Sequence, residues 1–258
     1  MSAGPPPAPT GTLYVVASPI GNLEDLSLRA ARLLRTSPVI AAEDTRRAQV
    51  LLAHADSTGA SIGQRAVVSL FDGNEMARGA RIVDELRAGR DVVLISDAGT
   101  PGVSDPGARL VAHVLAEELP VCSIPGPVAA VTALVASGLP TDSFLFVGFP
   151  PRDPGPRQQL FGQLRQQRAT LIFYEAPDRV AATCADLALA FGPDRRACLA
   201  RELTKVFEQY VRLPIGQLAD RFAGEPPRGE CTLLLEGAAA QAASEVDVET
   251  DVRRLLAE

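Results

Sequence analysis

A glycine-rich loop is the first stretch whose residue types could bind a ligand. Four apolar residues at 92–95 predict a short buried strand, which ends in SDAGTPGVSDPG before an apolar-periodic helix begins. Glycine permits positive φ and a close approach of the backbone to a bound group. A loop of this kind at the carboxyl end of a strand is a common ligand site in α/β sheets. We expect Ser104 or Asp105 to cap the next helix and leave free N–H groups at its start, and the alternative for the whole loop is an ordinary strand-to-helix turn.

Polar side chains that could do acid–base chemistry follow two other predicted strands. Glu43, Asp44 and Arg46 come directly after the apolar run 39–42, and Asn74 lies shortly after a run at 67–70. Carboxylates can act as general bases. Asp and Asn are also common helix N-caps, so a structural role competes with a catalytic one.

The elements that must position these groups repeat a strand-loop-helix pattern. Strands are expected at 12–17, 39–42, 67–70, 92–95 and 121–124, and helices at 28–37, with Ser27 as its cap, 47–55, 75–88, 108–118 and 128–137. The strands are near-continuous apolar runs rather than alternating ones. The first part of the chain, 12–140, therefore predicts an α/β domain with a parallel sheet covered by helices on both faces.

A second α/β domain is expected at 141–237, with a mixed sheet and helices. Its strands are predicted at 144–149, 170–174, 197–203, 208–213 and 231–236, and its helices at 157–167, 179–191 and 215–222. The stretch 150–156 holds too much proline for helix or strand. We expect residues 1–11 to be a disordered leader and 238–258 a peripheral acidic tail.

Composition limits the classes of function. The chain has 258 residues, of which 47% are hydrophobic. Its formal net charge of −6 argues against strong sequence-independent binding of nucleic acid, which needs a basic surface. The four cysteines are far apart and there are two histidines, so buried thiols of a reducing compartment are expected and no metal site. Without a long apolar run or a signal segment, we expect a cytoplasmic protein that does not enter a membrane.

Positive charge gathers locally. Between Pro151 and Thr170 the chain has Arg152, Arg157, Arg165 and Arg168 against a single acidic residue. These arginines could face phosphates, and the alternative is a solvated helix face.

The familiar phosphate-binding and nucleophile motifs are absent from the sequence. The chain contains no GxGxxG after its first strand, no GxxxxGK[ST] and no GxSxG. Nicotinamide oxidoreductases, P-loop nucleotidases and α/β-hydrolases are thereby disfavoured. What remains is a site built from several loop ends, which suits a folded small molecule held largely by backbone groups.

Seven ordered motifs resemble one family. They are VASPIGNLEDLSLRA, IAAEDTR, LISDAGTPGVSDPG, IPGPVAAVTALVASGLP, LIFYEAPDR, LARELTK and GECTLLLEG. In this order they resemble the ribosomal RNA small subunit methyltransferase I family, within the tetrapyrrole methylase-like superfamily. The resemblance implies a two-domain class III methyltransferase that forms a homodimer and binds S-adenosylmethionine (SAM) in the cleft between its domains. It also implies methyl transfer to the ribose 2′-hydroxyl of a cytidine in the decoding region of 16S rRNA, within the 30S subunit.

The resemblance also implies site residues. Cofactor contacts, mostly through backbone atoms, are expected from Ile20, Gly21, Ala98, Gly99, Thr100, Val103, Val128, Ala129, Phe173, Tyr174, Glu175 and Leu203. For Val128, Ala129 and Leu203, membership of the core is the alternative.

Methyl transfer from a sulfonium needs an aligned 2′-oxygen, and a nearby base would help because a ribose hydroxyl is a poor nucleophile. Asp44, Arg46 and Asn74 are our candidates for orienting or activating the ribose, with helix capping as the competing role of Asp44 and Asn74.

The chain departs from the family at two places. Phe71 and Gly73 stand where relatives often carry histidines, so no histidine mechanism is expected. RDPGPR replaces a lysine-rich loop, which leaves Arg152 and Arg157, with Arg165 nearby, to meet RNA phosphates.

Two other functions are kept open. One is a methyltransferase on the same scaffold acting on a tetrapyrrole or a diphthamide-pathway substrate, although a porphyrinoid would need no arginine-rich rim. The other is a non-catalytic RNA-binding or ribosome-assembly factor, which would not bind SAM.

Overall fold

The computed structural model describes residues 10–71 and 73–239, which form two compact units. The first unit holds the chain up to Ala133 together with Glu202–Gln209, and the second holds Leu134–Arg201 and the chain from Tyr210 onward. Of the predicted leader and acidic tail, residues 1–9 and 240–258 lie outside the described residues, as does Asp72. Among the helices described, none is long and apolar enough to cross a membrane.

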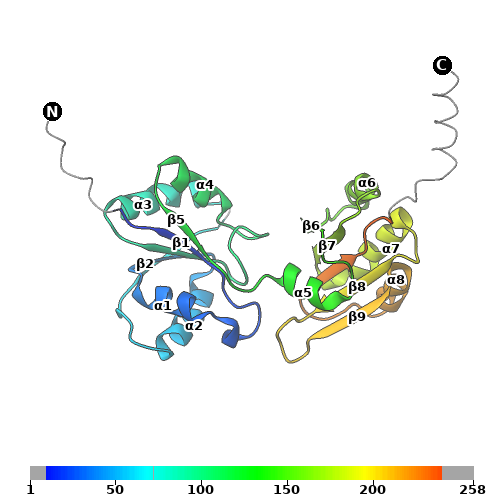
Figure 1. Cartoon of the computed structure of the whole chain (residues 1–258), viewed down its shortest axis with the longest axis horizontal. Coiled ribbons are helices and arrows are strands. Elements are labelled where there is room, and N and C mark those ends of the chain that lie inside the picture. The colour runs from blue at the N-terminus through cyan, green and yellow to red at the C-terminus, as the bar shows by residue number, and fades with distance from the viewer. Residues whose placement is uncertain (1–9, 72, 240–258) are drawn as a thin grey trace, which may run out of the picture. The chain divides into compact units, whose positions relative to one another are not determined.

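The first unit is built on a parallel sheet in the order β3-β2-β4-β1-β5. Figure 1 shows α3 and α4 on one side of this sheet and α1 and α2 on the other. Its strands are β1 (Leu13–Val16), β2 (Val39–Ala42), β3 (Ala66–Ser69), β4 (Val92–Ile95) and β5 (Val121–Ile124). Its helices are η1 (Leu23–Asp25), α1 (Leu28–Thr36), α2 (Thr45–Ser57), α3 (Glu75–Arg87) and α4 (Ala108–Ala116), and α5 (Ala129–Ser137) leads into the second unit.

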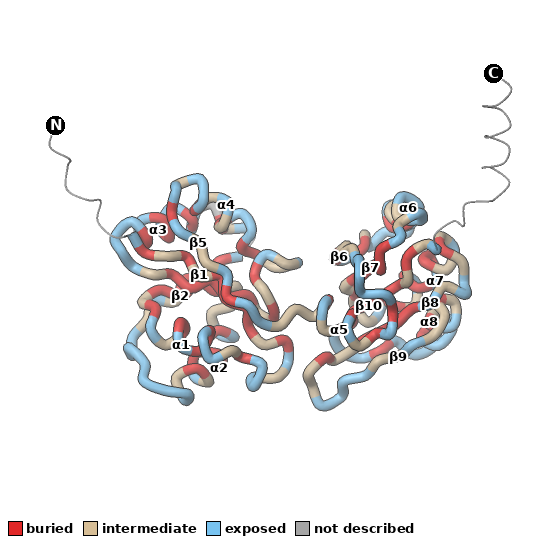
Figure 2. Tube along the Cα trace, in the orientation of Figure 1, coloured by how far each residue is buried: buried red, intermediate tan, exposed pale blue. Residues whose placement is uncertain are grey.

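Helices cover both faces of this sheet, as the sequence predicts. Alternate side chains of a strand point to opposite faces, so Val93 packs with α1 and α2 whereas its neighbours Val92 and Leu94 pack with α3 and α4. The inner strands β1, β2 and β4 are almost wholly buried (Figure 2), whereas the edge strands β3 and β5 are partly exposed. Burial of both faces explains the continuous apolar sequences of the inner strands. Ser27 caps α1 as expected, because its hydroxyl accepts the N–H of Ala30.

The second unit is a mixed sheet in the order β6-β7-β10-β8-β9. Its strands are β6 (Phe144–Gly148), β7 (Thr170–Glu175), β8 (Arg196–Arg201), β9 (Gln209–Pro214) and β10 (Cys231–Leu235). Its helices are α6 (Pro154–Leu164), η2 (Pro177–Arg179), α7 (Val180–Phe191) and α8 (Ile215–Ala223), and α6, α7 and α8 pack their apolar side chains on one face of the sheet. β6 runs parallel to β7, and β10 runs antiparallel to both of its neighbours.

Two local predictions need correction. Helix α6 begins at Pro154, inside the stretch predicted to be irregular, because proline is tolerated in the first turn, where an N–H has no helical partner. Neither Ser104 nor Asp105 caps α4: its N-cap is Gly107, whose N–H is bound by the buried Glu75 carboxylate.

The division of the chain also differs from the expected boundary between Pro140 and Asp142. The units meet within α5, between Ala133 and Leu134. Residues 202–209 join the first unit although they connect β8 to β9, because they pack against the loop after β1. A sequence pattern does not reveal such a contact, since its partners lie far apart in the chain.

The cysteines agree largely with the expectation of buried thiols. Cys184, Cys198 and Cys231 are buried and Cys122 is half-buried, and all four are free. Burial raises the pKa of Cys184 to about 12 and that of Cys198 to about 11. Both side chains therefore remain protonated thiols at neutral pH and act as small apolar core residues.

Candidate functional site

The glycine-rich loop after β4 is bonded to the loop after β1. The N–H of Ser18 donates to the carbonyl of Gly99 at 2.8 Å, and the N–H of Gly99 donates back to Ser18 at 3.0 Å. The Ser18 hydroxyl also points to the carbonyls of Ser96 and Gly99, at 3.2 and 3.3 Å. Gly99 has a φ of +84°, a conformation that favours glycine. The two loops therefore form one fixed backbone surface at the carboxyl ends of β1 and β4.

Two further segments of the first unit join this surface. The Thr100 hydroxyl donates to the carbonyl of Pro127 at 3.3 Å, which brings in the loop after β5. A Cβ on Gly21 would lie 3.0 Å from the carbonyl oxygen of Leu203, which brings in the segment 202–209. Nine of the predicted cofactor residues thus belong to one compact unit: Ile20, Gly21, Ala98, Gly99, Thr100, Val103, Val128, Ala129 and Leu203.

The other three predicted cofactor residues belong to β7 of the second unit. Phe173 is fully buried in its core, with its ring centroid 5.6 Å from that of Phe161. The buried Glu175 carboxylate accepts the hydroxyl of Thr183 at 2.5 Å and pairs with Arg179 at 2.9 Å. The side chains of Phe173 and Glu175 therefore have structural roles, and a cofactor contact from either stays a prediction for its backbone.

Asp44 is the N-cap of α2, as the competing interpretation held. Its carboxylate accepts the N–H of Arg46 at 2.8 Å and pairs with the exposed Arg46 guanidinium at 3.3 Å. The backbone N–H of Arg46, with help from its side chain, holds the pKa of Asp44 below its usual range. Asp44 is therefore a weak base at neutral pH, which favours an orienting role over proton abstraction.

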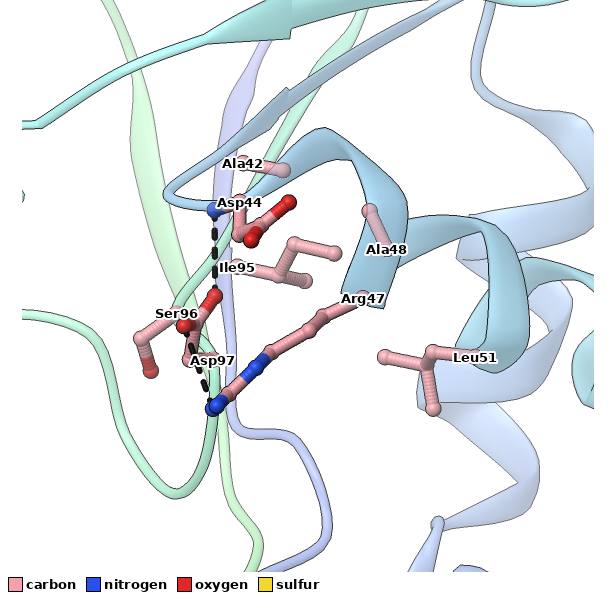
Figure 3. Close-up of a pocket in the computed structure, with 8 residues that line it drawn as sticks. All are labelled: Ala42, Asp44, Arg47, Ala48, Leu51, Ile95, Ser96 and Asp97. Atoms are coloured by element: carbon pink, nitrogen blue, oxygen red, sulfur yellow. Dashed lines mark hydrogen bonds and ion pairs between the residues drawn. The ribbon is translucent and has the colours of Figure 1, made fainter.

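Sequence reasoning missed Asp97, which connects the loop after β4 to the loop after β2 (Figure 3). Its carboxylate accepts the N–H of Asp44 at 3.0 Å and pairs with Arg47 at 3.2 Å. Its own N–H donates to the Glu43 carboxylate at 3.3 Å. Its position just after the apolar strand 92–95 was the sequence signal that could have identified it as a site residue. Asp97 therefore ties the predicted cofactor loop to the predicted catalytic residue Asp44.

A small pocket lies where these two loops meet. It is lined by Ala42, Asp44, Arg47, Ala48, Leu51, Ile95, Ser96 and Asp97 (Figure 3). Its volume of about 20 Å³ has room for a water molecule and not for a cofactor. The arrangement can thus hold a small polar group beside the Asp97 carboxylate.

Asn74 is engaged within its own turn. Its side-chain oxygen accepts the N–H of Phe71 at 2.9 Å, and its amide donates to the carbonyl of Ser69 at 3.2 Å. It occupies the N-cap position of α3 without making a side-chain cap bond. The structure therefore gives Asn74 a role in shaping the end of β3, and its catalytic role stays a prediction.

The predicted RNA-contacting arginines separate into two groups. Arg157 is 4% exposed, and its guanidinium binds Asp186 through two nitrogens at 2.6 and 2.7 Å. The prediction that Arg157 contacts phosphates is therefore wrong, because its guanidinium is buried in the second unit and its charge is paired with the Asp186 carboxylate. Arg152 and Arg165 are exposed, which a phosphate contact requires.

Sequence reasoning also missed Phe146 and Phe149, which lie beside the predicted cofactor residue Tyr174 in the second unit. The ring of Tyr174 lies edge-on to Phe146 at 4.8 Å and to Phe149 at 5.7 Å between centroids. Phe149 is 59% exposed and lies three residues before the exposed Arg152 in the sequence. An exposed aromatic side chain can stack a nucleobase.

Comparison with known proteins gives a consistent family. The profile of the tetrapyrrole (corrin/porphyrin) methylases matches residues 12–219. A protein of Halalkalibacterium halodurans named ribosomal RNA small subunit methyltransferase I is 44% identical over 88% of this chain and 76% of its own length. Relatives with the same name occur in Pseudomonas aeruginosa, 44% identical over 88% of this chain and 79% of that protein, and in Synechocystis sp., 42% identical over 96% and 88%.

Solved structures show the same fold. A uroporphyrin-III C-methyltransferase of Thermus thermophilus has a TM-score of 0.61 at 24% identity, covering 88% of this chain and 94% of that one. A crystal structure of the enzyme with that name in complex with S-adenosylhomocysteine gives 0.59 at 22%, covering 88% and 97%. A cobalt precorrin-4 methyltransferase gives 0.62 at 17%, covering 87% and 94%.

Proposed function

The chain belongs to the ribosomal RNA small subunit methyltransferase I family of the tetrapyrrole methylases, and from that membership we propose that it methylates the ribose 2′-hydroxyl of a cytidine in the decoding region of 16S rRNA. The observation that carries the proposal is the convergence of the loops after β1, β4 and β5 with Leu203 in one unit. We further propose that the substrate is the rRNA within the 30S subunit and that the enzyme works in the cytoplasm as a homodimer.

The residues present fit SAM as the cofactor. The loop after β4 offers glycine backbone in a positive-φ conformation at Gly99, and Gly21 lets the segment 202–209 pack closely against the loop after β1. When bound, SAM supplies a methyl group on a positively charged sulfur. Backbone atoms of Ile20 and Gly21, and of Ala98 to Thr100, would hold it. Val103, Val128, Ala129 and Leu203 would add contacts, and so would Phe173, Tyr174 and Glu175.

The chain's own part in the reaction is to orient the ribose. Asp44 stays ionised at neutral pH and is fixed by Arg46 and by the Asp97 carboxylate. A fixed carboxylate can hold the 2′-hydroxyl in line with the methyl group, which raises the rate through alignment. Arg46 and Asn74 are placed at the same edge of the sheet by the parallel arrangement of β2 and β3.

The proposed reaction is tested by mapping 2′-O-methylation. Small subunits that lack the modification are incubated with the protein and SAM, and the 16S rRNA is read by primer extension and mass spectrometry. We expect one new 2′-O-methylcytidine in the decoding region, dependent on SAM. A protein that binds SAM but leaves the rRNA unmodified would favour a tetrapyrrole or diphthamide-pathway substrate, and one that binds no SAM would favour an assembly factor.

The pH dependence of activity tests the role of Asp44. Since folding lowers the pKa of Asp44, its carboxylate is charged at neutral pH, and its stabilising contribution is lost only as the pH falls through that lowered pKa. We expect Asp44→Asn to reduce kcat by roughly 10- to 100-fold with the KM for SAM unchanged. The pH profile between 6 and 9 should keep its shape. A change of that shape in the variant would instead make Asp44 the general base.

The salt dependence of binding tests the arginine surface. We expect Arg152→Ala with Arg165→Ala to weaken binding to small subunits and to reduce the slope of log K against log salt by about 0.7–0.9 for each lost phosphate contact. Arg29→Ala, at an exposed position of α1, is the matched control and should leave the slope unchanged. If the double variant and the control have the same salt slope, Arg152 and Arg165 do not contact RNA phosphates.

A further inference from the structure

Thr204 lies in a turn whose backbone is strained. The turn runs from Glu202 to Lys205 and is closed by the Lys205 N–H, which donates to the Glu202 carbonyl at 3.0 Å. Glu202 and Thr204 have φ angles of +50° and +65°. A β-branched residue in the left-handed region is a genuine outlier, because its Cβ comes too close to the following carbonyl oxygen. Strain of this kind persists where the surrounding structure imposes it, and it gathers at functional sites.

The side-chain hydroxyl of Thr204 has no hydrogen-bond partner in the part of the chain that the structure describes, although its oxygen is shielded from solvent. The backbone N–H of the same residue is satisfied, since it donates to the Glu208 carboxylate at 2.6 Å. A buried polar group without a partner is destabilising, because it has given up its hydrogen bonds to water. Thr204 thus destabilises the ligand-free protein in two ways, through its left-handed backbone and through its buried hydroxyl, which has no partner among the described residues.

The hydroxyl faces the loop after β1. A Cβ on Gly21 would lie 2.9 Å from Thr204 Oγ1, so only glycine lets the backbone come this close. The next residue in that loop toward the N-terminus, Ile20, reaches Gly99: its Cγ2 lies 3.5 Å from where a Cβ on Gly99 would be. Thr204 therefore lies among the loops proposed to hold the cofactor, although only Leu203 was predicted as a contact from its motif, LARELTK.

We propose that Thr204 binds SAM directly, its hydroxyl making a hydrogen bond to a polar group of the cofactor. This inference rests on the proposed function. A hydroxyl donates and accepts, so it can pair with a ribose hydroxyl, an adenine nitrogen or the carboxylate of the methionine part. The bound cofactor satisfies a group that the free protein leaves unpaired, and this explains why a strained threonine occupies the turn.

The test is calorimetric titration of the full chain with S-adenosylhomocysteine, alongside thermal melting of the ligand-free protein. We expect Thr204→Val to raise the Kd about tenfold, because the variant removes the hydroxyl and keeps the branched shape. Thr204→Ser should stay within about threefold of the wild type. The melting temperature of Thr204→Val should equal or exceed that of the wild type, since an unpaired buried hydroxyl has been removed.

Three outcomes would overturn the inference or its premise. A wild-type Kd in Thr204→Val rejects the contact, and a lowered melting temperature with that Kd would mean that the hydroxyl serves the free protein, through a bound water. If the wild type itself binds no S-adenosylhomocysteine, the proposed function fails. If Thr204→Val does not fold, the Kd of Thr204→Ala for S-adenosylhomocysteine is compared with that of the wild type instead. Thr36→Val, at an exposed position of α1, is the control for loss of a threonine hydroxyl and should leave the Kd unchanged.

Discussion

Replacing Gly99 with valine is expected to weaken the binding of S-adenosylhomocysteine roughly 100-fold, because the strain and the loss of two backbone hydrogen bonds to Ser18 together cost about 3 kcal/mol. Gly99 has a φ of +84°, which a β-branched residue adopts at a cost of about 1–2 kcal/mol. Its N–H and C=O form the bridge to Ser18, so relaxing the strain means breaking the bond between the loops after β4 and β1. Both loops would then leave the conformation proposed to hold the cofactor. Calorimetric titration measures the loss, and rRNA methylation should fall with it.

Gly63 supplies a matched control for backbone strain. Its φ is +80°, and an added Cβ there would meet nothing within 4 Å. Gly63→Val should therefore carry a similar conformational cost and leave the Kd for S-adenosylhomocysteine unchanged. If the two variants lose stability equally and both bind normally, the loop after β4 is not the cofactor loop.

Replacing Asp186 with alanine is expected to destabilise the second unit by about 3–5 kcal/mol, because it leaves the Arg157 charge buried without its partner. The Asp186 carboxylate also accepts the side-chain amide of Gln158 at 2.8 Å, so a second group loses its bond. Arg157 is held further by the carbonyl of Arg152 at 3.0 Å, which limits its escape to solvent. Urea denaturation followed by circular dichroism measures the change.

The double replacement Arg157→Met with Asp186→Leu tests the physical cause. Removing both charges together should restore most of the stability lost in Asp186→Ala, since a buried ion pair is often no better than apolar residues of similar size. The folded double variant should bind small subunits as the wild type does. If the double variant is as stable as the wild type but binds small subunits much more weakly, Arg157 contacts RNA and its purely structural role is contradicted.

Much of the first unit could be predicted because its signals are local. Apolar runs such as 92–95 mark strands buried on both faces, and Ser27 marks a helix start, since periodicity and capping involve residues close in sequence. The proline-rich start of α6 was predicted to be irregular because proline is unfavourable inside a helix. The structure uses it in the first turn, where that penalty does not apply.

The sequence by itself determined the parallel sheet, the glycine-relaxed loops at its strand ends and, through its ordered motifs, the family. Only the tertiary structure decided which polar groups meet: Asp186 pairs with Arg157, Asp97 binds the N–H of Asp44, and the hydroxyl of Thr204 faces Gly21 with no hydrogen-bond partner among the described residues. The physical reason is the distance along the chain between the residues that interact. Backbone conformation and hydrophobic periodicity are set by near neighbours, whereas the burial and pairing of a charge depend on residues that folding brings together from distant parts of the chain.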